Sequence, residues 1–164
     1  MTVRPENWDN SKAQGLPEDR FSRRVRLWAV GLSLLAAVIH GIAAPEHLQE
    51  WWGYGLFFVI AALAQMVYAP VLLLQPWRWD DPVMTASDSD RYARLAYLLG
   101  IVGNGSFIVL YLVTRTIGIP FFGPEAGEVE PITLLGLASK ATEIALVACL
   151  VVLTRRTKAA ASAM

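Results

Sequence analysis

The chain has 164 residues, no net charge, 55% hydrophobic residues and only 17% charged residues. Soluble domains are about 45–50% apolar and about a quarter charged, so both values are shifted toward those of a membrane protein. The lack of a basic excess argues against nucleic acid as a partner. The single cysteine excludes an intrachain disulfide framework and a zinc site built on several thiolates.

Four apolar runs dominate the sequence, and they cover residues 27–44, 54–74, 95–113 and 132–153. Only Lys140 and Glu143 place a formal charge inside a run. Roughly 20 helical residues cross a bilayer core of ~30 Å, and a helix satisfies its own backbone groups in lipid. The sequence therefore predicts an all-α, four-helix transmembrane bundle with up-down-up-down topology.

The polar ends and connections of the chain set the predicted boundaries. We expect a polar tail over residues 1–22, a membrane domain over 23–156 and a C-terminal tail over 157–164. The connection over residues 75–94 contains prolines and then a Ser-Asp-Ser-Asp run, which predicts a turn followed by a helix N-cap. The glycine- and proline-rich connection over 114–131 predicts a non-helical loop.

Basic residues are distributed unequally between the two sides of the predicted bundle. Twelve of the 14 Lys and Arg residues lie in the two terminal segments and the second connection, whereas the other two connections contain only Arg115. By the positive-inside rule, both termini are cytoplasmic and the two remaining connections face outward.

Polar residues within the runs are expected to form a layer. Ser33, Gln65, Asn104 and Glu143 each lie about 11 residues from the expected outer end of their run, or about 16 Å at 1.5 Å per residue. Lys140 lies one turn outward of Glu143, so the two can pair. Such a layer locks helix register, carries a proton or cation, or supplies a buried metal ligand.

A second group of polar residues is expected near the outer surface, and His40 is its first member. Pro45 is predicted to end the first helix and to open a short surface helix over residues 45–52, in which His47 and Glu50 share a face. These histidines and carboxylates suggest a site for zinc, copper, iron or manganese. The predicted ligands are His40, His47, Glu50 and Glu143, with Glu46, Glu128 and Glu130 as weaker candidates.

Two segments resemble small four-span bacterial membrane proteins. They are Pro-Glu-His-Leu-Gln-Glu-Trp-Trp at 45–52, which continues into Gly-Leu-Phe-Phe at 55–58, and Gly-Ile-Pro at 118–120 followed by Gly-Pro-Glu-Ala-Gly-Glu-Val-Glu at 123–130. The resemblance implies a multi-pass protein of the bacterial inner membrane, and it implies no particular activity.

Three functions remain open from the sequence. The first is a metal-binding or charge-handling site at the extracytoplasmic face. The second is an accessory or assembly subunit of a larger membrane complex, and the third is a proton or cation transporter that uses Lys140 and Glu143. No arrangement of residues suggests catalysis, and the expected partners are the lipid bilayer and other membrane subunits or a second copy of the chain.

Overall fold

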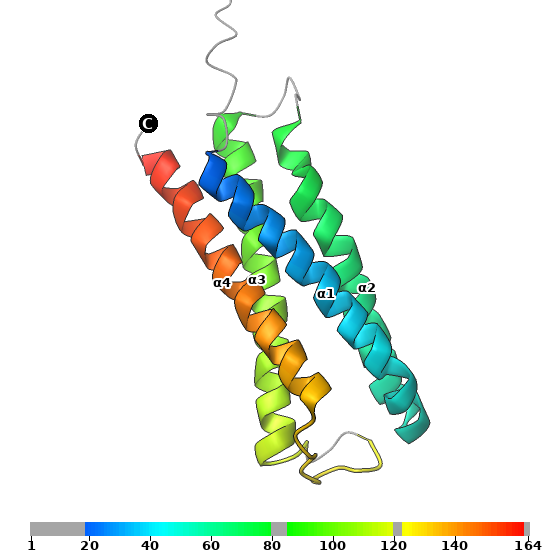
Figure 1. Cartoon of the computed structure of the whole chain (residues 1–164). Coiled ribbons are helices and arrows are strands. Elements are labelled where there is room, and N and C mark those ends of the chain that lie inside the picture. Colours follow the sequence, from blue (N-terminus) through cyan, green and yellow to red (C-terminus); the bar gives the residue numbers. More distant parts are fainter. Residues whose placement is uncertain (1–18, 80–84, 120–122, 163–164) are drawn as a thin grey trace, which may run out of the picture.

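The computed structural model describes residues 19–79, 85–119 and 123–162, and all regular structure within these residues is helical. Consecutive long helices run in opposite directions (Figure 1). Each of them is long and apolar enough to cross a membrane. The prediction of an all-helical protein with four long apolar helices is therefore confirmed. The elements are α1 (Arg20–Glu50), α2 (Trp52–Leu74), the short 3-10 helix η2 (Pro76–Arg78), α3 (Ala86–Thr116) and α4 (Leu134–Ser162).

Helix α1 does not break at Pro45, so the prediction of a separate surface helix is wrong. The helix continues through Pro45 to Glu50 and ends at Trp51, whose backbone is extended. Proline removes one backbone donor from the helix, but the residues after it can still bond normally. The Trp51 N–H, for example, donates to the His47 carbonyl at 3.0 Å. The C-terminal end of α1 therefore lies six residues beyond the expected end at Ala44.

Two helix ends are fixed by side-chain caps. Thr85 begins α3 in a capping box, in which its hydroxyl accepts from the Asp88 N–H and the Asp88 carboxylate accepts from the Thr85 N–H. Asp19 caps α1 by accepting from the Ser22 N–H at 2.8 Å, and Arg156 of α4 donates to its other oxygen at 2.7 Å. The hydrogen bonds from Ser22 hold the pKa of Asp19 below its usual value.

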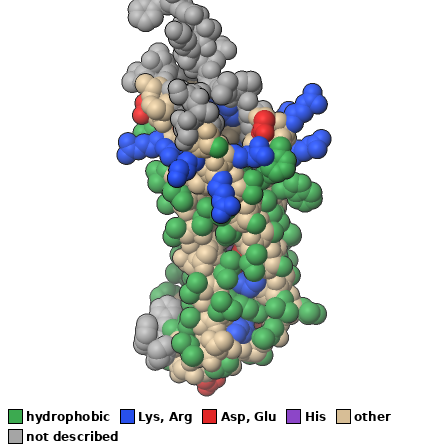
Figure 2. All heavy atoms as spheres, turned by 90° about the vertical axis from the view of Figure 1, so that its left-hand side faces the viewer, with side chains coloured by type: hydrophobic (Ala, Val, Ile, Leu, Met, Phe, Trp, Pro, Cys, Tyr) green, Lys and Arg blue, Asp and Glu red, His purple; other side chains and the backbone are tan. Residues whose placement is uncertain are grey.

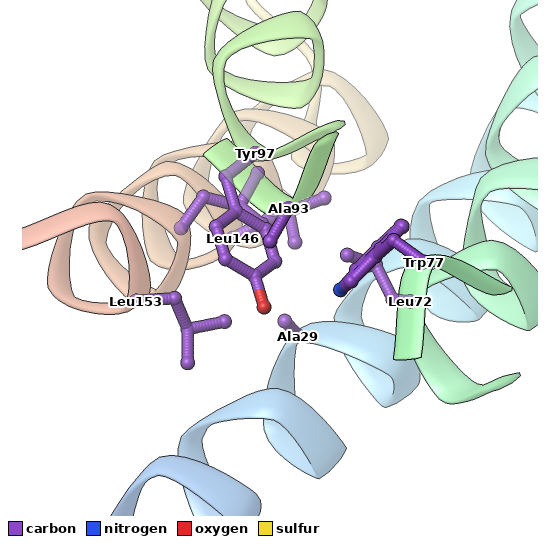
Figure 3. Close-up of a cluster of buried hydrophobic side chains, with 8 residues drawn as sticks. Ala29, Leu72, Trp77, Ala93, Tyr97, Leu146 and Leu153 are labelled. Atoms are coloured by element: carbon purple, nitrogen blue, oxygen red, sulfur yellow. The ribbon is translucent and has the colours of Figure 1, made fainter. Parts of the chain in front are cut away.

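The helices pack tightly at the end of the bundle where α1 and α3 begin. A hydrophobic core fills this end, and Figure 3 shows its side chains pointing toward one another from α1, α2, η2, α3 and α4. Arg26 is buried beside it and donates to the Leu73 carbonyl at 2.9 Å, which satisfies a backbone acceptor at the end of α2. The core residues are Ala29, Leu72, Trp77, Ala93, Tyr97, Leu146, Leu150 and Leu153.

The two helical pairs separate toward the other end of the bundle. Helix α1 packs on α2 and α4, and α3 packs on α4 and η2. Figure 1 shows the α1–α2 pair diverging from the α3–α4 pair toward the end that carries the loop between α3 and α4. Side-chain hydrogen bonds join α2 to α3, among them Tyr68 Oη to the Ala96 carbonyl at 3.0 Å. A cavity lined by residues of all four long helices lies at this end.

The outer surface of the bundle is apolar along its length and basic at one end. Large side chains such as Val67, Leu99 and Val102 are more than 60% exposed. Figure 2 shows Lys and Arg side chains gathered at the end where α1 and α3 begin. This surface suits lipid around the middle of the bundle and phosphate headgroups around the basic end.

Two glycines of α3 provide a matched test of the packing. A Cβ at Gly100 would lie 2.2 Å from Tyr68 Oη and 2.7 Å from Leu150 Cδ1, whereas a Cβ at Gly103 would meet nothing within 4 Å. We expect Gly100→Ala to lower the free energy of unfolding by about 1 kcal/mol or more, because the added methyl group pushes α3 away from its neighbours. Gly103→Ala should be neutral or stabilising, because alanine favours the helix. Unfolding of the detergent-solubilised protein by SDS measures both, and equal effects would contradict the prediction.

Candidate functional site

The centre of the site is Glu143, whose carboxylate is fully buried between α4 and α1. Its Oε2 accepts from Lys140 Nζ at 2.5 Å, and its Oε1 accepts from Ser139 Oγ at 3.0 Å. His40 Nε2 lies 3.1 Å from the same Oε1. A buried carboxylate is therefore enclosed by an ammonium group, a hydroxyl and an imidazole.

The helical repeat explains three of these four positions. Ser139 and Lys140 precede Glu143 by four and three residues, so all three side chains lie on one face of α4. His40 comes from α1, and its ring contacts the rings of Phe58 and Phe107 at centroid distances of 5.8 and 5.4 Å. The aromatic rings exclude water from one side of the imidazole, which strengthens its interaction with the carboxylate.

Lys140 has partners besides Glu143. Its ammonium group donates to the Phe107 carbonyl at 3.4 Å and lies 5.4 Å from the centre of the Tyr111 ring. The guanidinium group of Arg115 lies 4.9 Å from the same ring and pairs with the Glu130 carboxylate. Lys140 and Arg115 are thus each held in an opposite-charge pair and lie beside the same aromatic ring.

A separate polar network lies deeper in the bundle. Ser33 Oγ donates to the side-chain oxygen and the backbone carbonyl of Gln65, both at 2.8 Å. Gln65 Nε2 donates to Asn104 Oδ1 at 2.8 Å, and Asn104 Nδ2 donates to the Gly100 carbonyl. The network joins α1, α2 and α3 and includes neither Lys140 nor Glu143.

The expected single layer is therefore divided between two levels. Glu143 lies nine residues from the start of α4 and His40 ten residues from the end of α1, so these two meet. Ser33 lies 17 residues from the end of α1, because that helix continues past Pro45. Counting from the true helix ends, instead of the ends of the apolar runs, places Glu143 beside His40.

The four predicted metal ligands form two pairs and do not surround one point. His47 Nδ1 lies 2.6 Å from Glu50 Oε2, whereas His40 pairs with Glu143. The Phe58 ring stacks on His47 at 4.2 Å and also contacts His40, so it lies against both imidazoles. Among the residues that the structure describes, no three His, Cys, Asp or Glu side chains are arranged to hold a metal ion.

Of the remaining predicted ligands, two are exposed and one is half-buried. Glu46 and Glu128 are exposed, and Glu130 pairs with Arg115. The loop that carries Glu128 and Glu130 is non-helical, as expected from its glycines: Gly123 and Gly127 both have a φ of 85°. A Cβ at Gly123 would lie 2.2 Å from Tyr54 Oη, so this loop packs directly on α2.

A cavity of about 1030 Å³ lies between the diverging helical pairs and reaches down to His40 and Lys140. Its walls include five aromatic side chains that sequence reasoning did not assign to the site. Their spacing in the sequence indicates a shared aromatic surface, because residues three or four apart lie on one face of a helix. These aromatic residues are Tyr54, Phe57 and Phe58 of α2 and Phe107 and Tyr111 of α3.

Comparison with known proteins adds no further assignment. No protein-family model, curated protein or solved structure matches the chain.

Proposed function

We propose that the chain is a four-span protein of the bacterial inner membrane that takes up a proton from the outer side at His40, Glu143 and Lys140. The observation that carries this proposal is the fully buried Glu143 carboxylate, which lies 3.1 Å from His40 and 2.5 Å from Lys140. Ionisable groups inside membrane helices cost at least about 2.5–3.5 kcal/mol on insertion scales and mark ion and proton pathways.

The distribution of charge supports an orientation with both termini in the cytoplasm. Basic side chains gather at the end of the bundle where α1 and α3 begin (Figure 2). The opposite end carries the acidic loop of Glu125, Glu128 and Glu130. Because cytoplasmic loops are enriched in Lys and Arg, the cavity then opens toward the outside.

The chemistry of the cluster supports reversible proton binding. Imidazole is the side chain that ordinarily changes charge close to neutral pH. With neutral His40, the charges of Glu143 and Lys140 cancel, and one proton on His40 gives the cluster one net positive charge. The cavity reaches His40 and Lys140, whereas the apolar core of Leu146 and Leu150 fills the other half of the bundle. This arrangement favours uptake from one side over a continuous channel.

The protein contains only two histidines, which makes the proposal directly testable. In a His47→Gln background, the NMR signals of the remaining imidazole report His40 alone. If the cluster takes up a proton, these signals change with pH. Adding Glu143→Gln should move the midpoint of the change, because a carboxylate within about 4–6 Å biases the charge of its neighbour. Glu128→Gln, at the exposed loop, should leave the midpoint unchanged.

Reconstitution into liposomes tests the side from which the proton arrives. A pH step on the cavity side should change the His40 signal at once, and the same step on the other side should not. A constant His40 signal at all pH values, or a midpoint that Glu143→Gln leaves in place, would overturn the proposal. An accessory role in a larger membrane complex stays a prediction, which co-purification of other subunits in mild detergent tests.

A further inference from the structure

The walls of the cavity are mainly apolar and aromatic. Two of the aromatic rings, Phe57 and Phe107, meet edge to face at a centroid distance of 5.7 Å with their planes at 89°. Tyr54 and Phe58 extend the aromatic surface along α2, and Ile39 and Leu110 add aliphatic surface. A volume of about 1030 Å³ is at the upper end of the range of small-molecule sites. The ligand that suits these walls is an apolar molecule with a bulky body.

The charges that line the cavity leave an excess of carboxylates. Both basic side chains that line the cavity have a carboxylate partner: Lys140 pairs with Glu143, and Arg115 pairs with Glu130. Glu46, Glu125 and Glu128 also line the cavity, and they make no ion pair within the described part of the chain. Carboxylates above low-dielectric walls concentrate cations at the mouth of a cleft and repel anions.

The inner end of the cavity is formed by a buried imidazole. His40 is 3% exposed, and its Nε2 lies 3.1 Å from Glu143 Oε1, without the geometry of an aligned hydrogen bond. A positive charge on this imidazole would therefore lie where the cavity ends.

We propose that this cavity binds an organic cation with an apolar body, such as a quaternary onium ion or a bulky aromatic amine. The aromatic rings attract the positive charge through their faces, and the carboxylates at the mouth attract it from solution. The inference rests on the proposed function for its pH dependence, because a proton on His40 adds positive charge to the same cavity and opposes the cation. The groups that face His40 are Lys140 and Glu143 of α4 and the Phe58 and Phe107 rings.

Two ions of the same shape and opposite charge provide the test. Tetraphenylphosphonium and tetraphenylborate both carry four phenyl rings around one centre. We expect the phosphonium ion to bind the detergent-solubilised protein saturably at one site per chain at about pH 8, as measured by equilibrium dialysis. The borate ion should bind at least about tenfold more weakly, which corresponds to about 1.4 kcal/mol. Equal uptake of the two ions would show partition into detergent and would overturn the proposal.

Variants of the walls and the mouth locate the site. Phe57→Leu should weaken phosphonium binding about tenfold, because it removes an aromatic face, and Phe21→Leu, at the far end of α1, should not. The double variant Glu125→Gln/Glu128→Gln should weaken binding severalfold, while Asp90→Asn near the start of α3 is the matched charge control. Binding that all four variants leave unchanged would contradict the proposed site.

The two proposals fail separately. If His40 changes charge from the cavity side but the phosphonium ion does not bind, the ligand assignment is wrong and the proton site stands. If the phosphonium ion binds with the same affinity at about pH 5 and about pH 8 and His40 shows no charge change, the proton site is wrong and the cation site stands.

Discussion

Glu143→Leu is expected to lower the free energy of unfolding by about 3–5 kcal/mol. The substitution removes the carboxylate that Lys140 Nζ contacts at 2.5 Å and that His40 Nε2 approaches at 3.1 Å. The ammonium group of Lys140 is then left without its counter-charge on a side chain that is only 13% exposed. Unfolding by SDS, followed through the fluorescence of the six tryptophans, measures the loss.

A double-mutant cycle separates the ion pair from simple packing. Lys140→Met alone should also be destabilising, because it removes a partner from Glu143. The double variant Lys140→Met/Glu143→Leu should lose much less than the sum of the single losses, since replacing a whole buried pair by apolar groups is often close to neutral. Strictly additive losses, or a stable Glu143→Leu single variant, would show that the pair does not hold α4 in place.

Gln65→Leu should cost about 2–3 kcal/mol through a different mechanism, the loss of hydrogen bonds inside the bundle. Gln65 accepts from Ser33 and donates to Asn104 at 2.8 Å, so its removal leaves Asn104 Oδ1 buried without a donor. Asn104→Leu should cost a similar amount, because Gln65 Nε2 then loses its acceptor. The same SDS assay measures both.

The combination of the two substitutions shows whether the hydrogen bond itself is responsible. Gln65→Leu/Asn104→Leu removes both partners together and should recover much of the stability that each single variant loses. Ser106→Ala is the surface control, since Ser106 is exposed and bonds only to the Val102 carbonyl of its own helix. It should change stability by less than about 0.5 kcal/mol. A comparable loss in the control would mean that the assay does not resolve buried bonds from exposed ones.

The apolar runs predicted the helices well because a bilayer-length stretch of apolar residues has few alternatives to a helix. The ends of the helices were harder to predict. Charged residues such as Arg20 join the helices outside the runs, because a long charged side chain can extend into a polar region while the backbone stays helical. Pro45 does not end α1, because a proline near a helix end forfeits only one hydrogen bond.

These errors at the ends displaced the predicted site. The pairing of Lys140 with Glu143 follows from their spacing alone, and the pairing of His47 with Glu50 does also. The meeting of His40 and Glu143 depends on how far α1 continues and where α4 begins, which the sequence does not state. The aromatic walls depend on how α2 and α3 diverge, and that divergence arises from tertiary packing.

The hydrophobic core shown in Figure 3 lies on one side of the buried cluster, and the cavity lies on the other. Leu146 and Leu150 are fully buried on α4 beyond Glu143, whereas His40 and Lys140, which contact the Glu143 carboxylate, line the aromatic vestibule. If the cluster takes up a proton as proposed, it exchanges with the solution of a single compartment. A difference in acidity between the two compartments would then reach His40 as the value on the vestibule side and not as an average of the two.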